Sequence, residues 1–213
     1  MDEQLFFLIN SNHTPFFDTL MFLITQKTVW IPLYLSLLYV VWRNYSWKGV
    51  VGIASMIGVS MFFTDWLLHH VVREWIGRLR PNNPDNPIFP RVHLVWGKHG
   101  AGYGFPSAHS ANIWMVTIIV WHWIRQRWLT LSMVTLSLLF CYSRVYLGFH
   151  YPGDILGGLV YALLVTIPVM WYHNRKWHFQ PQGTRHWWLP SLMILLTLIS
   201  FAITATITSN QSL

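Results

Sequence analysis

Six apolar stretches alternate with polar connections along the chain. Each is close to the ~20 residues that a helix needs to cross a bilayer, and together they cover residues 28–43, 49–69, 109–124, 128–143, 153–173 and 187–207. This pattern predicts an all-α fold, an integral membrane bundle of about six transmembrane helices. We expect residues 1–213 to form a single domain.

Two segments depart from this alternation. Residues 15–26 place apolar side chains at helical spacing around Asp18, which is typical of an interfacial or half-inserted helix, so residues 1–27 are predicted to be an N-terminal interfacial segment. Residues 73–108 form a long polar connection rich in Arg, Asn, Pro and Gly. Loops of this length in compact proteins tend to be functional.

The composition supports membrane insertion. Hydrophobic residues make up 54% of the chain and charged residues 10%, whereas a soluble domain carries about 25% charged residues. The single Cys141 allows no disulfide and no cysteine metal site. The net charge of +7 is scattered between apolar segments, so no nucleic-acid partner is expected. The first residues include two acids rather than a basic signal-peptide region, and we expect the chain to insert through its own spans.

The basic residues indicate an orientation. With an even number of spans, three short loops lie on one side and carry seven of the fourteen basic residues: Arg43, Lys48, Arg125, Arg127, Arg175, Lys176 and Arg185. The other side also has seven, but three of them are needed for the site described below. The positive-inside rule then places the short loops in the cytoplasm. The prediction is a multi-pass protein of the cytoplasmic (inner) membrane with residues 73–108 on the periplasmic or extracytoplasmic side.

Three polar clusters lie at helix ends on that outer side: REWIGRLRP (73–81), PSAH (106–109) and SRVYLGFHYPGD (143–154). Singly, each has an ordinary explanation, because Arg side chains extend to lipid headgroups, Ser is a good N-cap, and Asp stabilises the first turn of a helix. Their occurrence at one membrane face favours a functional site, since ionisable residues at membrane depth are costly.

The residue types in these clusters suit phosphate chemistry. Arg side chains bind tetrahedral oxyanions with fork-shaped donors, and the helix that opens near Ser107 offers backbone N–H groups to an anion. His109 and His150 can divide nucleophile and acid roles. Asp154, four residues after His150, could hold that imidazole in one tautomer, as an acid does in a Ser-His-Asp triad.

These residues resemble the type 2 phosphatidic acid phosphatase superfamily, which shares its core with vanadium haloperoxidases, and in particular its membrane lipid phosphatase branch. That family carries K-x6-RP, PSGH and SR-x5-H-x3-D, and this chain has R-x6-RP, PSAH and SR-x5-H-x3-D at Arg73, Arg80, Pro81, Pro106 to His109, Ser143, Arg144, His150 and Asp154. Two positions depart from the family pattern. Arg73 replaces Lys, which puts the contact geometry in question, and Ala108 replaces Gly, which tolerates a positive φ better than Ala does.

The resemblance implies a role for each matching residue. His150 would attack phosphorus to form a phosphohistidine, Asp154 would orient it, and His109 would protonate the leaving oxygen and later activate water. The phosphate oxygens would be bound by Arg73, Arg80, Ser107, the backbone of Ala108, and Arg144. Neither a metal nor a cofactor is implied.

The predicted function is therefore a metal-independent lipid phosphate phosphohydrolase whose partners are the bilayer and its lipid phosphate substrate. Undecaprenyl diphosphate, lipid A phosphate, phosphatidylglycerol phosphate and phosphatidate all remain open, as does the oligomeric state. Alternatives are a lipid phosphotransferase using the same phosphohistidine, a membrane transporter and a zinc enzyme. The glycine-rich residues 97–105 could form a lid or simply a turn, and Lys98 and His99 could touch substrate.

Overall fold

The computed structural model describes residues 1–177 and 181–211, and within these ranges the regular structure is helical, with one isolated bridge between Leu79 and Tyr103. The α-helices are α1 (Asp2–Asn10), α2 (Pro15–Ile24), α3 (Ile31–Asn44), α4 (Trp47–Met61), α5 (Arg73–Ile76), α6 (Ala108–Ile124), α7 (Arg127–Tyr146), α8 (Pro152–Lys176) and α9 (Leu189–Gln211). Short 3-10 turns (η1, Thr28–Trp30; η3, Phe89–Arg91; η4, Val95–Gly97) and the π-helix η2 (Phe62–Val72) complete the set. The predicted all-α class is confirmed.

The number of spans differs from the prediction. Among the described residues, four helices are long and apolar enough to cross a membrane: Trp47–Ile76, Arg127–Tyr146, Pro152–Lys176 and Leu189–Gln211. The pair Pro15–Ile24 and Thr28–Asn44, bent by 66°, makes five if it is one broken span. The protein is thus a multi-pass membrane protein, but the expected count of six is not confirmed.

Two expected spans, residues 28–43 and 109–124, account for the difference in the count. The helix α3 has 14 residues and is about 21 Å long, short of the ~30 Å of a bilayer core. Only together with α2 is the apolar segment long enough, and the chain bends between them where Thr25 ends α2 and the 3-10 turn η1 begins. This break lies at the predicted boundary between residues 15–26 and 28–43. The other expected span, α6, has 17 residues and is about 26 Å long, also short of the bilayer core.

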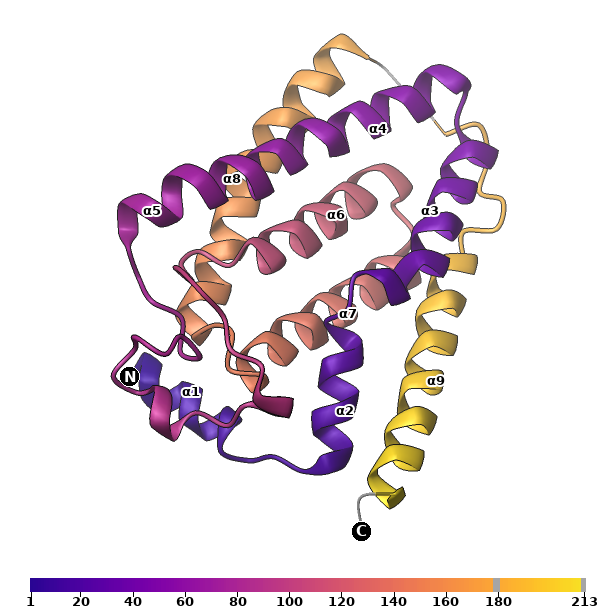
Figure 1. Ribbon diagram of the computed structural model, residues 1–213. Coiled ribbons are helices and arrows are strands. Elements are labelled where there is room, and N and C mark those ends of the chain that lie inside the picture. The colour runs from indigo at the N-terminus through magenta and orange to yellow at the C-terminus, as the bar shows by residue number, and fades with distance from the viewer. Residues whose placement is uncertain (178–180, 212–213) are drawn as a thin grey trace.

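The helices place the polar clusters at one end of the bundle. Figure 1 shows the N-terminus, α5 and the loop after it at the same end as the α7–α8 turn, while the α3–α4 and α6–α7 turns lie at the opposite end. The helix α6 lies inside this arrangement and packs against α8, α7, α4 and η2. Its first residues therefore come close to the first residues of α8.

A glycine permits that close approach. A Cβ atom added at Gly158 of α8 would lie 2.5 Å from the Ser107 carbonyl oxygen and 2.7 Å from Ser110 Cβ. Any larger residue would push the two helices apart. In addition, Ser107 N donates to the Asp154 carbonyl oxygen (2.9 Å) and the Ser110 hydroxyl to that of Ile155 (2.8 Å). These contacts join the PSAH cluster to the start of α8.

Candidate active site

The start of α8 holds His150 and Asp154 in fully buried positions. Pro152 is the first residue of this helix, where its missing N–H costs nothing, and the Asp154 carboxylate reaches back to accept a hydrogen bond from Tyr151 N (3.0 Å). The same oxygen, Oδ2, lies 3.5 Å from His150 Nδ1. This separation is too long for a hydrogen bond, but catalytic hydrogen bonds are often long without substrate.

The PSAH cluster begins α6. Ser107 is the N-cap, and its hydroxyl accepts from Ser110 N (3.4 Å). Ala108 is the first helical residue and does not have a positive φ, so replacing the family's glycine causes no backbone strain here. His109 is partly buried, and its ring stacks at 6.2 Å from that of Phe140 on α7.

The arginines of the first cluster have different partners. Arg73 is buried, and its Nε donates to the Pro106 carbonyl oxygen (2.9 Å). The Nε of Arg80 donates to the Tyr103 carbonyl oxygen (3.2 Å). Both guanidinium groups are thereby tied to the segment that leads into α6. Arg78, from the same cluster, instead pairs with the carboxylates of Asp2 and Asp154.

Arg144, from the third cluster, is buried near the end of α7. Its Nη1 donates to the hydroxyl of Thr25 (3.0 Å), and its guanidinium lies 4.2 Å from the centre of the Phe149 ring. Thr25 ends α2, so the N-terminal helices reach the site through this contact.

Several buried nitrogens of these residues lack a hydrogen-bond partner among the described residues. They are Arg73 Nη2, Arg144 Nε, His150 Nδ1 and His150 Nε2. Buried polar atoms are rarely unpaired in native proteins, and each instance calls for an explanation. Two cationic donors and an imidazole left unpaired at one end of a bundle are well suited to an oxyanion.

Charged and titratable residues from all three clusters lie near His150. Burial lowers the pKa of His150 well below its usual 6.5, and Arg144, Arg80, Arg73 and His109 act in the same direction. The imidazole is therefore neutral near pH 7, with a lone pair available on one nitrogen. All three polar clusters contribute to this effect, so the structure brings them to one place.

One contact at the site was missed by the sequence interpretation. His69, near the end of the second expected span, places its Nδ1 3.0 Å from Arg73 Nη1. The signal was present in the sequence, because residues four apart share a helix face. His69 lies in the π-helix η2, which ends directly before Arg73, and π-helical turns often occur at functional sites.

The glycine-rich loop has a conformational explanation. Gly97 and Gly102 have positive φ values of 65° and 72°, which favour glycine. Lys98 lies over the Phe22 ring of α2 at 4.1 Å, and the exposed His99 ring contacts the Gly97 carbonyl oxygen at 3.2 Å. These contacts support the turn interpretation of residues 97–105 over the lid.

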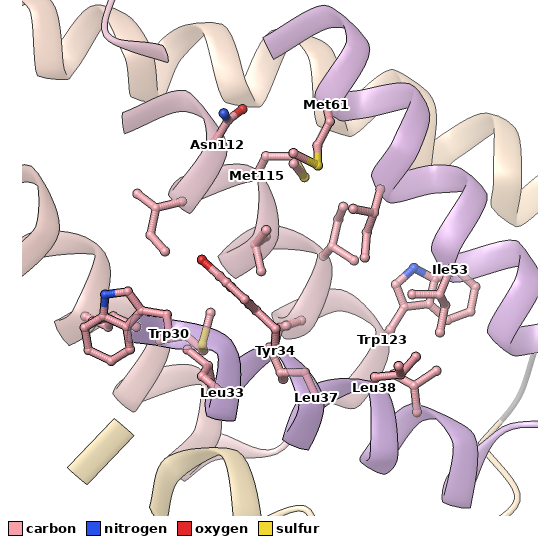
Figure 2. A pocket seen from close by; sticks show the side chains of 18 of the residues that line it. Trp30, Leu33, Tyr34, Leu37, Leu38, Ile53, Met61, Asn112, Met115 and Trp123 are labelled. Atoms are coloured by element: carbon pink, nitrogen blue, oxygen red, sulfur yellow. The ribbon is translucent and has the colours of Figure 1, made fainter. Parts of the chain in front are cut away.

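An apolar cavity of about 490 Å³ extends from His109 between α3, α4, α6 and α7. Residues at helical spacing on α6 line it: His109, Asn112, Ile113, Val116, Val120 and Trp123. In Figure 2, Tyr34 and Leu37 of α3 face Asn112 and Met115 of α6 across this space, with Ile53 and Met61 contributed by α4. The lining residues from His109 to Trp123, 14 positions apart, span about 21 Å along α6.

One group of side chains among the described residues is close enough to share a metal ion: His13, Asp18 and His93. The rings of His13 and His93 stack in parallel, 3.6 Å apart, so their lone pairs do not converge on one point. His93 Nε2 already lies 3.1 Å from Asp18, whose carboxylate also accepts from the Tyr146 hydroxyl (2.7 Å). Ordinary hydrogen bonding accounts for this cluster, and none of the three belongs to the predicted site.

Known proteins resemble this chain over most of its length. It is 39% identical over 160 residues to a lipid A 4'-phosphatase of Bacteroides thetaiotaomicron. The aligned region covers 75% of this chain and 71% of the relative. It is 26% identical over 181 residues to a lipid A 4'-phosphatase of Porphyromonas gingivalis, covering 83% and 76%. The crystal structure of Aquifex aeolicus LpxE shares the fold, with a TM-score of 0.63 at 19% identity over 79% of this chain and 94% of that one.

The family assignment rests on both the motifs and their arrangement. The family model described as the PAP2 superfamily matches residues 49–178, a range that contains all three polar clusters. The resemblance predicted from these clusters is confirmed, and the chain belongs to the PAP2 superfamily, as a membrane phosphatase of that family.

Proposed function

We propose that this protein is a lipid phosphate phosphohydrolase that works through a phosphohistidine on His150. The observation that carries the proposal is the set of unpaired buried nitrogens on Arg73, Arg144 and His150. Charge-assisted hydrogen bonds from such donors are strong, and phosphoryl transfer needs mainly positioning and charge neutralisation.

The first step breaks the bond between phosphorus and the leaving oxygen. His150 Nδ1 faces Asp154, so Nε2 is the attacking nitrogen and forms a bond to phosphorus, while His109 gives a proton to the leaving oxygen. Arg73, Arg80, Arg144, Ser107 and the N–H of Ala108 bind the phosphoryl oxygens. Asp154 stabilises the positive charge that develops on the imidazole.

The second step releases the phosphate. His109, now without that proton, takes one from a water molecule whose oxygen attacks phosphorus, and the bond to Nε2 breaks. An alcohol taking the place of water would make the protein a phosphotransferase. No step involves a metal ion, and activity that persists in EDTA is the expected outcome.

The cavity along α6 supports a lipid as the substrate. A phosphate bound near His109 would lie at the membrane–water interface, and its apolar tail could occupy the cavity lined by Leu37, Val116 and Trp123. The length of about 21 Å is sufficient for a tail reaching toward the bilayer centre, about 15 Å from the interface. A water-soluble ester would not require such a cavity.

Among lipids, we infer that a glycolipid phosphate monoester of the lipid A type is the preferred substrate, on the outer face of the cytoplasmic membrane. Two relatives with that printed activity support the substrate. The excess of basic residues in the three short loops supports the orientation.

The test is phosphate release by the purified protein from a panel of lipids, with and without EDTA. The panel contains lipid A, undecaprenyl diphosphate, phosphatidylglycerol phosphate and phosphatidate. We expect the highest kcat/KM on lipid A and no loss in EDTA. Product analysis with an added acceptor lipid separates hydrolysis from phosphotransfer. Release from none of these lipids would contradict the proposed function, and preference for a diphosphate would contradict the proposed substrate.

A further inference from the structure

The helix α1 lies outside the range that the family model matches, yet its first residue contacts the site. Asp2 Oδ1 accepts a hydrogen bond from Gly153 N (2.8 Å), in the first turn of α8. Backbone N–H groups there have no partner within the helix, and an acid at this end is also favoured by the helix dipole.

The absence of a side chain at Gly153 makes this contact possible. A Cβ atom at this position would lie 2.7 Å from Asp2 Oδ2. The helix α1 is held in place independently of Asp2, because Phe6 is fully buried against the Tyr151 ring at 5.5 Å, and Asn10 donates to the Tyr146 carbonyl oxygen (2.8 Å).

Arg78 joins Asp2 to the site. Its Nη2 donates to Asp2 Oδ2, and its Nη1 donates to Asp154 Oδ1 (2.9 Å). Its guanidinium lies 4.2 Å from the centre of the Tyr151 ring, so one planar group is fixed by two carboxylates and an aromatic face. This use of both terminal nitrogens sets Arg78 apart from Arg73 and Arg144, which keep a buried nitrogen unpaired.

Together these bonds fix both oxygens of Asp154. Oδ1 accepts from Arg78, while Oδ2 accepts from Tyr151 N (3.0 Å) and faces His150 Nδ1. Without Arg78, the carboxylate would lose the contact that keeps it charged in a fully buried position and prevents it from rotating about its side-chain bonds.

We propose that Asp2 and Arg78 are positioning residues that act through Asp154, so that α1 completes the active site from outside the range that the family model matches. This inference rests on the proposed function, since it assumes that Asp154 orients His150 for attack. Neither residue touches the phosphate, so both should affect the rate of the chemical step rather than substrate binding.

The test compares Asp2→Asn and Arg78→Gln with wild type in steady-state kinetics on the best lipid substrate. We expect kcat to fall about 10-fold for Asp2→Asn and up to about 100-fold for Arg78→Gln, with KM nearly unchanged. The side chains of Asp2 and Arg78 are each 33% exposed, but Arg78 also contacts Asp154 and the Tyr151 ring, so Asp2→Asn should fold even if Arg78→Gln does not. The matched control is Glu3→Gln, because Glu3 lies on the same helix and pairs with Arg91 (3.5 Å) at an exposed position.

A double-mutant cycle with Asp154→Asn measures whether the two substitutions affect kcat independently. A purely structural role of Asp2 would give independent effects. Residues that act through one another have non-additive effects, so Asp2→Asn should cause little further loss once Asp154 is replaced. Full additivity in this cycle would overturn the proposal, as would an effect confined to KM or equal rates for Asp2→Asn and Glu3→Gln. If instead the wild-type protein releases no phosphate, it is the proposed function that fails.

Discussion

The two ends of the cavity along α6 differ in what they offer a ligand. Near the end marked by His109, just beyond the residues that line the cavity, Arg73, Arg144 and His150 present buried nitrogens without partners among the described residues. Toward the other end, the walls are formed by side chains such as Val120, Leu136 and Trp123. This contrast fits an amphiphilic substrate. Its phosphate would react at the polar end, and its apolar tail would gain binding energy at the apolar end. Changes at the two ends should therefore affect different kinetic constants.

The largest effect is expected at the polar end from His150→Ala. Loss of the nucleophilic nitrogen should lower kcat by at least about 10⁴-fold, because no other group takes its place in the covalent step. Phosphate release from lipid A measures the loss. His122→Ala is the matched control, since His122 contacts Asn174 (2.9 Å). It has no role in the proposed mechanism and does not line the cavity. A loss under about 10-fold for His150→Ala would rule out the nucleophile assignment.

Separating α6 from α8 should have the next largest effect. In Gly158→Ala the new Cβ atom would meet the Ser107 carbonyl oxygen at 2.5 Å, and misplacement by about 1 Å can cost about 100-fold in rate. We expect kcat to fall about 10- to 100-fold with a lower melting temperature. Gly58→Ala is the control, because a Cβ there meets nothing within 4 Å. Equal kinetics for the two variants would show that this contact does not align the site.

Filling the apolar end should change affinity instead. Val116→Trp places a large ring in the cavity two turns from His109, and we expect KM for a lipid substrate to rise about 10-fold, or about 1.4 kcal/mol. The same variant should hydrolyse a short water-soluble ester, such as p-nitrophenyl phosphate, at the wild-type rate. An equal loss on both substrates would show that the cavity does not hold the lipid tail.

Restoring the family's lysine should have a smaller effect. Arg73→Lys keeps the charge but loses the Nε bond to the Pro106 carbonyl oxygen, so we expect a KM increase of about fivefold, equivalent to about 1 kcal/mol. The measurement is KM on lipid A, with kcat as its internal control. A lower KM in the lysine variant would mean that the arginine geometry is not adapted to this site.

Mild acidification should have the smallest effect. Because burial and the surrounding cations lower the pKa of His150 well below 6.5, its imidazole stays neutral as the pH falls, and only below 6.5 should protonation remove the nucleophile. Between about pH 7.5 and about pH 6.5, protonation of His150 should therefore lower kcat/KM by less than about twofold. A pH profile with its acidic midpoint at or above pH 6.5 would contradict this environment.

The sequence predicted the convergence of the three polar clusters better than it predicted the span count. The clusters lie at helix ends, and spacings such as that of His150 and Asp154 carry information about a shared helix face, so their convergence followed from the order of the spans. Hydropathy separated residues 15–26 from 28–43, but it did not show that the helices α3 and α6, with 14 and 17 residues, are shorter than a bilayer core requires. The contact of Asp2 with Gly153 joins residues 151 positions apart, which no local pattern encodes.

Trapping the covalent intermediate tests the central claim most directly. The protein is mixed rapidly with lipid A labelled at its phosphate, quenched in denaturant at alkaline pH, and digested for mass spectrometry. The account predicts a phosphoryl group on His150, which disappears in His150→Ala and accumulates in His109→Ala if that variant still transfers the phosphoryl group. A phosphoryl group on any other residue, or turnover by wild type with none trapped on His150, would contradict the account.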